Sequence, residues 1–308
     1  MSHKPHVLYK FYVRHKPHKA YKVPQKYDIF SKRGLSMDTK LAREFTKTCT
    51  DGWLQGWHER NGGNLSYRMT EKEVDEIRNL LNFDSEWKDI DACVPGLAGE
   101  YFMVTGSGKY FRNVELDFED NVCILRLDET GTRYQIVYGL VNGGRPTSEL
   151  PSHMMNLEVL KQRDADMRVV YHAHPANIIA LTFVLPLDDV TFTREIWEMI
   201  PECPLVFPQG IGLVPWMVPG KREIGEKTSE IMKTRNVAVW AHHGMFVCGR
   251  NFDEAFGLMH AVEKGAEILV KVLSMAGRKI NPVTAENLRS LEKPFGIKFD
   301  EKYLYEKK

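Results

Sequence analysis

The chain has 308 residues, of which 43% are hydrophobic, so it can bury a large core in one or two domains. Its longest apolar run, residues 178–187, contains Thr182 and Pro186 and is too short to span a bilayer. No charged-then-apolar segment opens the chain, and its five scattered cysteines form no Cys-x-x-Cys pair. We therefore expect a cytoplasmic protein with reduced thiols and no membrane partner.

The formal net charge of +1 hides an asymmetry between residues 1–36 and the rest of the chain. Residues 1–36 hold nine Lys and Arg against Asp28 alone, which leaves 33 basic and 40 acidic residues of the totals of 42 and 41. This mildly acidic remainder gives no electrostatic reason to predict nucleic-acid binding. Residues 1–36 show no sustained period and are predicted to be a disordered basic extension, with a tail that binds an acidic partner as the alternative. Met37 precedes the first patterned segment and is a second candidate start, so 37–308 is the predicted folded domain.

The first patterned segment predicts a helix from residue 38. An apolar stripe recurs every four residues, at Leu41, Phe45, Cys49, Trp53 and Trp57. We expect the helix to end at the Asn-Gly-Gly-Asn loop, residues 61–64, because Asn and Gly supply positive φ angles. The exposed amides and two carboxamides of this loop also suit an anion.

A second glycine-rich turn follows a polar insert at 70–99, which predicts one or two short helices. The strand expected at 101–104 leads into Thr-Gly-Ser-Gly-Lys at 105–109, which suits a phosphate but lacks the P-loop spacing. Strands at 122–127 and 134–138 predict a hairpin. A helix at 151–161 comes next, with Ser148 as its predicted N-cap and Glu149 in its first turn.

Two histidines one residue apart follow the apolar run 167–171, which predicts a short buried strand. Side chains alternate along a strand, so His172 and His174 project from the same face, and Pro175 ends the strand. Taken alone, the pair is explained equally well as two polar residues on a half-exposed strand and as two metal ligands. His243 follows another strand-like run, 236–240, and three imidazoles on strand ends leave one coordination position open, as in a catalytic zinc site.

The remaining segments alternate between short strands and helices. Strands are expected at 206–208, 212–215 and 245–249, and helices at 177–184, 191–199, 220–233, 252–276 and 284–291. Glu202 falls in a predicted turn between two prolines. Because several strands are adjacent in sequence, we predict an α/β fold with a mixed or antiparallel sheet and helices on both faces.

Five motifs occur in the order found in class II aldolases of the aldolase/adducin superfamily, at 61–65, 104–109, 146–151, 172–174 and 243–244. The segments 51–57, 70–99, 192–194 and 213–220 further resemble the rhamnulose-1-phosphate aldolase family. The resemblance covers about residues 38–290. It implies a three-layer α/β/α sandwich and a zinc-dependent catalytic domain that reversibly cleaves L-rhamnulose 1-phosphate to dihydroxyacetone phosphate and L-lactaldehyde.

The resemblance also implies roles for single residues. The zinc ligands, with one ion per subunit, match His172, His174 and His243. Glu149 matches the catalytic base, and Glu202 matches a carboxylate lent by the neighbouring subunit of a homotetramer whose sites lie at subunit interfaces. The phosphate of the sugar substrate would be bound by Asn61, Asn64, Ser107, Thr147 and Ser148. His242 matches no ligand position, and its role stays open.

The implied cleavage reaction requires the same kinds of group that the resemblance assigns, a metal ion and an acid–base residue. Breaking the C3–C4 bond leaves a carbanion beside a carbonyl, which needs a Lewis acid as electron sink and a general acid or base for the proton. The alternatives are sister enzymes with the same metal site, namely fuculose-phosphate aldolase and pentulose-phosphate 4-epimerase. Both are shorter, so the 70–99 insert disfavours them. A metal-free adducin-like interaction module is disfavoured by the retention of the three histidines and Glu149.

Overall fold

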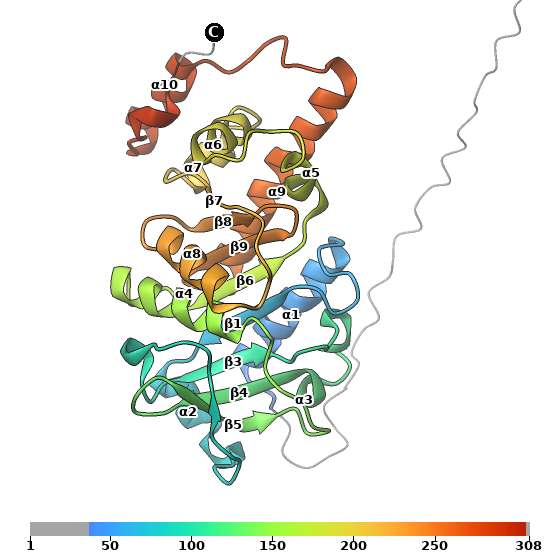
Figure 1. Cartoon of the computed structure of the whole chain (residues 1–308), viewed down its shortest axis with the longest axis vertical. Helices are drawn as coiled ribbons and strands as arrows, with labels where there is room; N and C mark the ends of the chain where they lie inside the picture. The colour runs from blue at the N-terminus through green and yellow to red at the C-terminus, as the bar shows by residue number, and fades with distance from the viewer. Residues whose placement is uncertain (1–36, 306–308) are drawn as a thin grey trace, which may run out of the picture. The chain divides into compact units, whose positions relative to one another are not determined.

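The computed structural model describes residues 37–305, so the predicted extension at 1–36 lies outside the described residues (Figure 1). A nine-stranded mixed sheet organises the fold, in the order β2-β5-β4-β3-β1-β6-β9-β8-β7. Its strands are β1 Asn64–Arg68, β2 Lys88–Asp89, β3 Tyr101–Thr105, β4 Val122–Leu127, β5 Arg133–Gly139, β6 Val169–Ala173, β7 Gly212–Val214, β8 Val237–Trp240 and β9 Gly244–Gly249. Only the β7–β8 pair is parallel among these strands, so the predicted mixed sheet is confirmed.

Helices cover both faces of the sheet, as predicted. They are α1 Lys40–Leu54, α2 Glu71–Glu76, α3 Phe118–Asn121, α4 Leu150–Arg163, α5 Ala176–Leu181, α6 Asp189–Trp197, α7 Glu202–Val206, α8 Arg222–Met232, α9 Phe252–Ala276 and α10 Ala285–Phe295. Helices α4 and α8 pack on one face, and α1, α5 and α9 pack on the other (Figure 1). The result is the three-layer α/β/α sandwich that the family resemblance implies.

The side chains of β6 alternate between two hydrophobic cores. Val169 and Tyr171 belong to the core shared with α1 and α9, whereas Val170 belongs to the core shared with α4 and α8. All three of these side chains are fully buried. Burial on both faces fixes the register of β6, because a slip of one residue would exchange the two sets of side chains.

Helix α1 ends at Leu54, earlier than predicted, and Trp53 is 40% exposed. A stripe with a period of four drifts around a helix that has 3.6 residues per turn. Leu41 and Trp53 therefore lie about 120° apart around the axis. Trp57 is still buried, but it lies in the connection after the helix, beyond Gly56 with its φ of +78°. The predicted single stripe is wrong in its last two positions.

Two further expectations need correction. The strand at 206–208 is absent from the described structure, because Val206 ends α7 and Pro208 has no N–H to give to a ladder. Glu202 is the first residue of α7 rather than part of a turn. In the described range, 37–305, we find no helix with the length and apolar character needed to cross a membrane.

Candidate active site

The ends of four neighbouring strands meet at one edge of the sheet. Asn64 begins β1 and pairs with His172 near the end of β6, while Gly244 begins β9 on the other side of β6. Thr105 ends β3, and its hydroxyl accepts a hydrogen bond from the Leu65 backbone at 3.1 Å. Because these strands are antiparallel, the starts of β1 and β9 lie beside the ends of β3 and β6. Residues far apart in the chain are thereby brought to one place.

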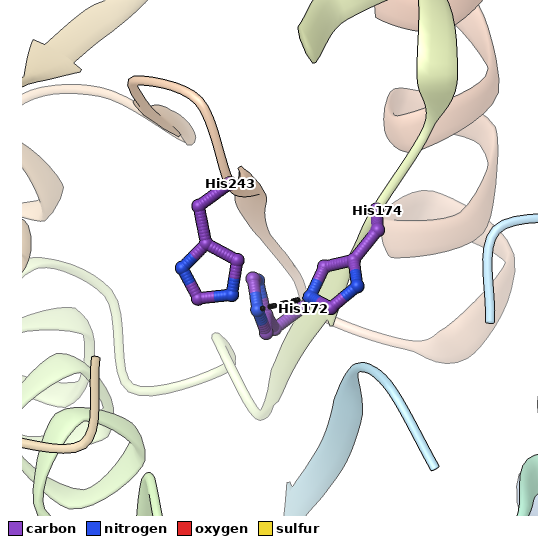
Figure 2. A group of neighbouring side chains, drawn as sticks. All are labelled: His172, His174 and His243. Atoms are coloured by element: carbon purple, nitrogen blue, oxygen red, sulfur yellow. Dashed lines mark hydrogen bonds between the residues drawn. The ribbon is translucent and has the colours of Figure 1, made fainter. Parts of the chain in front are cut away.

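The three histidines predicted from the sequence converge at this edge (Figure 2). Ring centroids are 5.0 Å apart for His172 and His174, 5.1 Å for His172 and His243, and 4.9 Å for His174 and His243. One ligand nitrogen from each ring lies within 4.8 Å of the others. His172 is buried and stacks on Phe246 with centroids 4.3 Å apart, which holds its ring in place. The three side chains together form the His triad.

Hydrogen bonds on the outer side of the triad set the tautomers of two rings. The Nδ1 of His172 donates to the Met245 carbonyl at 3.0 Å, and the Nδ1 of His174 donates to Oε1 of Glu59 at 2.7 Å. A neutral imidazole carries one proton, so both Nε2 atoms present lone pairs, as metal-ligating histidines usually do.

The two Nε2 atoms lie 3.2 Å apart, the contact drawn as a dashed line in Figure 2. Two lone pairs at this distance repel each other unless a cation lies between them. Zn–N distances of about 2.0–2.1 Å in tetrahedral geometry place two ligand nitrogens roughly 3.3–3.4 Å apart. Within residues 37–305 the buried Nδ1 of His243 also lacks a hydrogen-bond partner. The donor set therefore fits a divalent metal such as zinc.

Burial keeps two rings of the triad, His172 and His243, in the form that binds metal. Burial, with a smaller contribution from neighbouring imidazoles, lowers the pKa of His172 well below its ordinary value and the pKa of His243 to about 4. Both rings are therefore neutral near pH 7, so no proton competes with the ion for their lone pairs.

Glu149 is a buried carboxylate beside Nε2 of His172. Its Oε2 lies 3.6 Å from Nε2 of His172 and accepts a hydrogen bond from Nδ2 of Asn64 at 2.9 Å. With His172 neutral, the approach to the ring is not an ion pair. Burial raises the pKa of Glu149 to about 7, although the Asn64 hydrogen bond opposes this rise. A carboxylate with such a pKa is matched to proton transfer at neutral pH.

The predicted N-cap of α4 is wrong in detail. Glu149, not Ser148, occupies the N-cap position, and no side chain there caps the helix. The carboxylate of Glu149 instead points to Asn64, 85 residues away in the chain. The buried pairing with β1 takes precedence over a local cap, and Pro151 in the first turn needs no partner for a backbone N–H.

His242 shapes the turn that carries His243. It adopts a φ of +63°, which is unusual for a residue other than glycine. Its backbone N–H donates to Oγ1 of Thr182 at 3.0 Å, and its ring packs on Phe183 with centroids 4.3 Å apart. The ring of His242 is thus engaged with the segment after α5, while the next residue enters the triad.

The residues predicted to bind phosphate come from three segments near the triad. Residues 105–107 pair with 145–147 through a Gly106–Pro146 bridge and backbone hydrogen bonds of 2.8 and 3.0 Å, which place Ser107 opposite Arg145 and Thr147 opposite Thr105. Asn61 and Ser148 are exposed, whereas Thr147 is buried. The carboxamide of Asn64 is engaged with Glu149 and His153. Phosphate binding by these five residues stays a prediction.

Glu202 lies apart from the other predicted site residues. It is exposed at the start of α7, which packs against α6 and α9. No hydrogen bond or ion pair joins it to the triad or to Glu149 within the described part of this chain.

Three residues at the site were missed in the sequence: Glu59, Ser66 and His153. Glu59 holds His174, and Ser66 and His153 lie behind Asn64. A signal for the last two was present. Ser66 follows Asn64 by two residues and shares its face of a buried strand, and His153 follows Glu149 by four residues and shares its face of α4. Glu59 had no such signal.

We expect Gly244→Ala to weaken zinc binding about 10–100-fold, the range typical of changes just outside a metal's ligands. A Cβ at Gly244 would lie 2.4 Å from the Ala173 carbonyl and 2.9 Å from Cδ2 of His174, so the ring must move. Competition with a chromophoric chelator measures the affinity. Gly257→Ala on α9 is the matched control, because its Cβ meets nothing within 4 Å and affinity should stay unchanged. Equal affinities for the two variants would contradict the expectation.

Comparison with known proteins identifies the family. The sequence model of one protein family, the class II aldolase and adducin N-terminal domain, matches residues 43–270 of this chain. The chain is 47% identical to a rhamnulose-1-phosphate aldolase of Pectobacterium atrosepticum over 82% of this chain and 92% of that protein. It is 46% identical to one of Mannheimia succiniciproducens with the same two coverages.

A solved structure shares the fold as well. The sugar-phosphate aldolase of Thermotoga maritima matches with a TM-score of 0.67 and 28% identity, over 78% of this chain and 98% of that one. The family model, the relatives and the solved structure agree. This chain is therefore a member of the class II aldolase and adducin N-terminal domain family.

Proposed function

We propose that this protein is a rhamnulose-1-phosphate aldolase, an aldehyde-lyase that reversibly cleaves L-rhamnulose 1-phosphate to dihydroxyacetone phosphate and L-lactaldehyde. The observation that carries the reaction class is the His triad beside Glu149, whose Oε2 lies 3.6 Å from Nε2 of His172. The substrate rests on the rhamnulose-1-phosphate aldolases to which the chain is 46–47% identical.

We propose zinc as the metal, one ion per subunit. Three nitrogen donors with one position open are typical of catalytic zinc. A bound zinc ion would act as a Lewis acid for the negative charge that develops beside the breaking bond. The protein's part is to keep His172 and His243 neutral through burial, and to orient the rings of His172 and His174 through hydrogen bonds to the Met245 carbonyl and the Glu59 carboxylate.

Glu149 is the proposed general acid and base. Its place beside the triad suits the transfer of a proton at the carbon that carries the charge after C3–C4 cleavage, a contribution of typically ~10²–10⁴-fold. Burial and the Asn64 hydrogen bond hold its carboxylate in one orientation. Such positioning is part of the rate enhancement itself.

The phosphate is proposed to bind Asn61, Asn64, Ser107, Thr147 and Ser148. Neutral amides and hydroxyls orient a phosphate through directed hydrogen bonds rather than through net charge. The pairing of 105–107 with 145–147 supports a common role for these segments.

Glu202 is proposed to serve the site of a neighbouring subunit in a homotetramer. Its exposure on α7, apart from its own triad, supports this use. We propose that residues 37–308 form the catalytic domain, since the triad, both glutamates and the phosphate-binding candidates all lie there. The five unpaired cysteines support a cytoplasmic location.

A coupled assay for dihydroxyacetone phosphate tests the proposal, with rhamnulose 1-phosphate, fuculose 1-phosphate and ribulose 5-phosphate compared side by side. The highest kcat/KM is expected for rhamnulose 1-phosphate. A preference for fuculose 1-phosphate would assign the sister aldolase. Epimerisation of ribulose 5-phosphate without dihydroxyacetone phosphate would assign the epimerase. Zinc-loaded protein without any of these activities would favour the interaction module.

A further inference from the structure

Behind Glu149, three buried side chains form a continuous line of hydrogen bonds. Oε2 of Glu149 is 2.9 Å from Nδ2 of Asn64, and Oδ1 of Asn64 contacts Nε2 of His153. Nδ1 of His153 is 2.6 Å from Oγ of Ser66. Ser66 and His153 are fully buried, and Asn64 and Glu149 are each 6% exposed. We call these four residues the Glu149 relay.

The Glu149 carboxylate at one end of the Glu149 relay determines the direction of every hydrogen bond in it. A carboxylate only accepts, so the amide group of Asn64 faces Glu149 and its carbonyl faces His153. His153 must then donate from Nε2. Burial lowers the pKa of His153 to about 3, so the ring is neutral and its Nδ1 accepts from the Ser66 hydroxyl.

The alternative arrangement is disfavoured in a buried setting. Turning the Asn64 carboxamide over would place its oxygen against the Glu149 carboxylate and its amide against the ring of His153. Two acceptors, or two donors, that face each other in a buried site make no hydrogen bond, and water cannot reach them to replace it. The Glu149 carboxylate therefore selects one orientation of Asn64, and the Nε2–H of His153 meets the Asn64 carbonyl in that orientation.

Packing holds His153 where it can donate to the Asn64 carbonyl. It lies on the same face of α4 as Glu149, and its ring packs on Phe246 with centroids 5.6 Å apart. Phe246 in turn stacks on His172 of the triad, at 4.3 Å. One aromatic side chain thus supports both the ligand and the relay.

We propose that His153 is a positioning residue of the aldolase site: through Asn64 it holds the Glu149 carboxylate in the orientation required for proton transfer. The inference rests on the proposed function and assigns Asn64 a main role in orienting Glu149. It predicts that loss of His153 or of the Asn64 carboxamide lowers kcat more than it raises KM.

The test compares His153→Phe, which keeps a ring but removes the N–H, with His153→Gln, whose amide can donate in its place. Each is made in wild-type protein and in Asn64→Ala. His153→Phe should lower kcat about 10–100-fold, the scale of a small misplacement at a reacting group. KM and zinc content should change less than about two-fold, and His153→Gln should recover much of the loss.

The double variant provides the sharper result. If His153 acts through Asn64, adding His153→Phe to Asn64→Ala should lower kcat no further. Asn156→Leu is the matched control, because Asn156 is fully buried one turn along α4, and no described group hydrogen-bonds its side chain. Equal losses from His153→Phe in both backgrounds, or an Asn156→Leu loss as large as that of His153→Phe, would overturn the inference.

The ring tautomer provides a test that needs no variant to fold. Nitrogen-15 NMR of the zinc-loaded protein should show His153 neutral with its proton on Nε2, and a proton on Nδ1 would overturn the inference. If wild-type protein cleaves no ketose phosphate, the proposed function fails regardless of the tautomer. If it cleaves one and His153→Phe is as active, only the inference fails.

Discussion

Exhaustive chelation is expected to abolish cleavage of the ketose phosphate, and added Zn²⁺ should restore it. The reaction needs an electron sink for the developing carbanion, and among the described residues the His triad is the group suited to hold a metal. Without the ion, no positive charge offsets the repulsion between the facing lone pairs of His172 and His174. Activity should therefore follow zinc content, measured by elemental analysis and the coupled assay on the same samples.

Two neighbouring histidines offer a matched pair of variants for this prediction. His243→Asn should reduce zinc to well below one ion per chain and remove activity, since it takes away a ligand. His242→Asn should leave the zinc content near one, because the His242 ring contacts Thr182 and Phe183, and Asn tolerates the φ of +63°. Full activity in metal-free protein would contradict the metal-dependent mechanism, and equal zinc loss in both variants would contradict the assignment of His243.

Glu149→Ala and Glu202→Ala are each expected to lower kcat by ~10²–10⁴-fold, the range for loss of a general acid or base. A mixture of the two inactive proteins, unfolded together and reassembled, should nevertheless regain activity. If each site takes Glu202 from its neighbour, a site is complete when its owner carries Glu202→Ala and its donor carries Glu149→Ala. Random assembly of a head-to-tail ring gives this pairing at roughly one quarter of sites.

The controls for this mixture are reassembly and chain exchange. Each variant reassembled alone must stay inactive, and mass spectrometry of differently tagged chains must show mixed oligomers. If Glu202 instead serves its own subunit, no mixture unites both intact carboxylates in one site. Verified mixed oligomers that are as inactive as their parents would therefore rule out sharing.

The sequence by itself determined that His172 and His174 share one face of a strand, and it determined most of the helices and strands. A β-strand has a period of two, so the spacing of His172 and His174 places both on one face whatever surrounds them. The absence of an N–H in Pro175 ends the strand beside them. Helix α9 begins and ends as predicted, because one sustained apolar period runs between Asn251, its N-cap, and Gly277 with a φ of +67°.

Only the tertiary structure decided how the triad and Glu149 are held. The bond from Glu59 to His174 joins residues 115 positions apart, and the contact of Asn64 with His153 joins residues 89 apart. A local period shows which face of an element a side chain occupies, but it does not show which distant residue will meet it. They meet because antiparallel pairing places the start of β1 beside the end of β6, and because α4 packs over that edge. In the sequence pattern Glu149 is only a helix start, and the family resemblance alone marks it as a base. Its burial beside Asn64 and His172 supplies the physical reason.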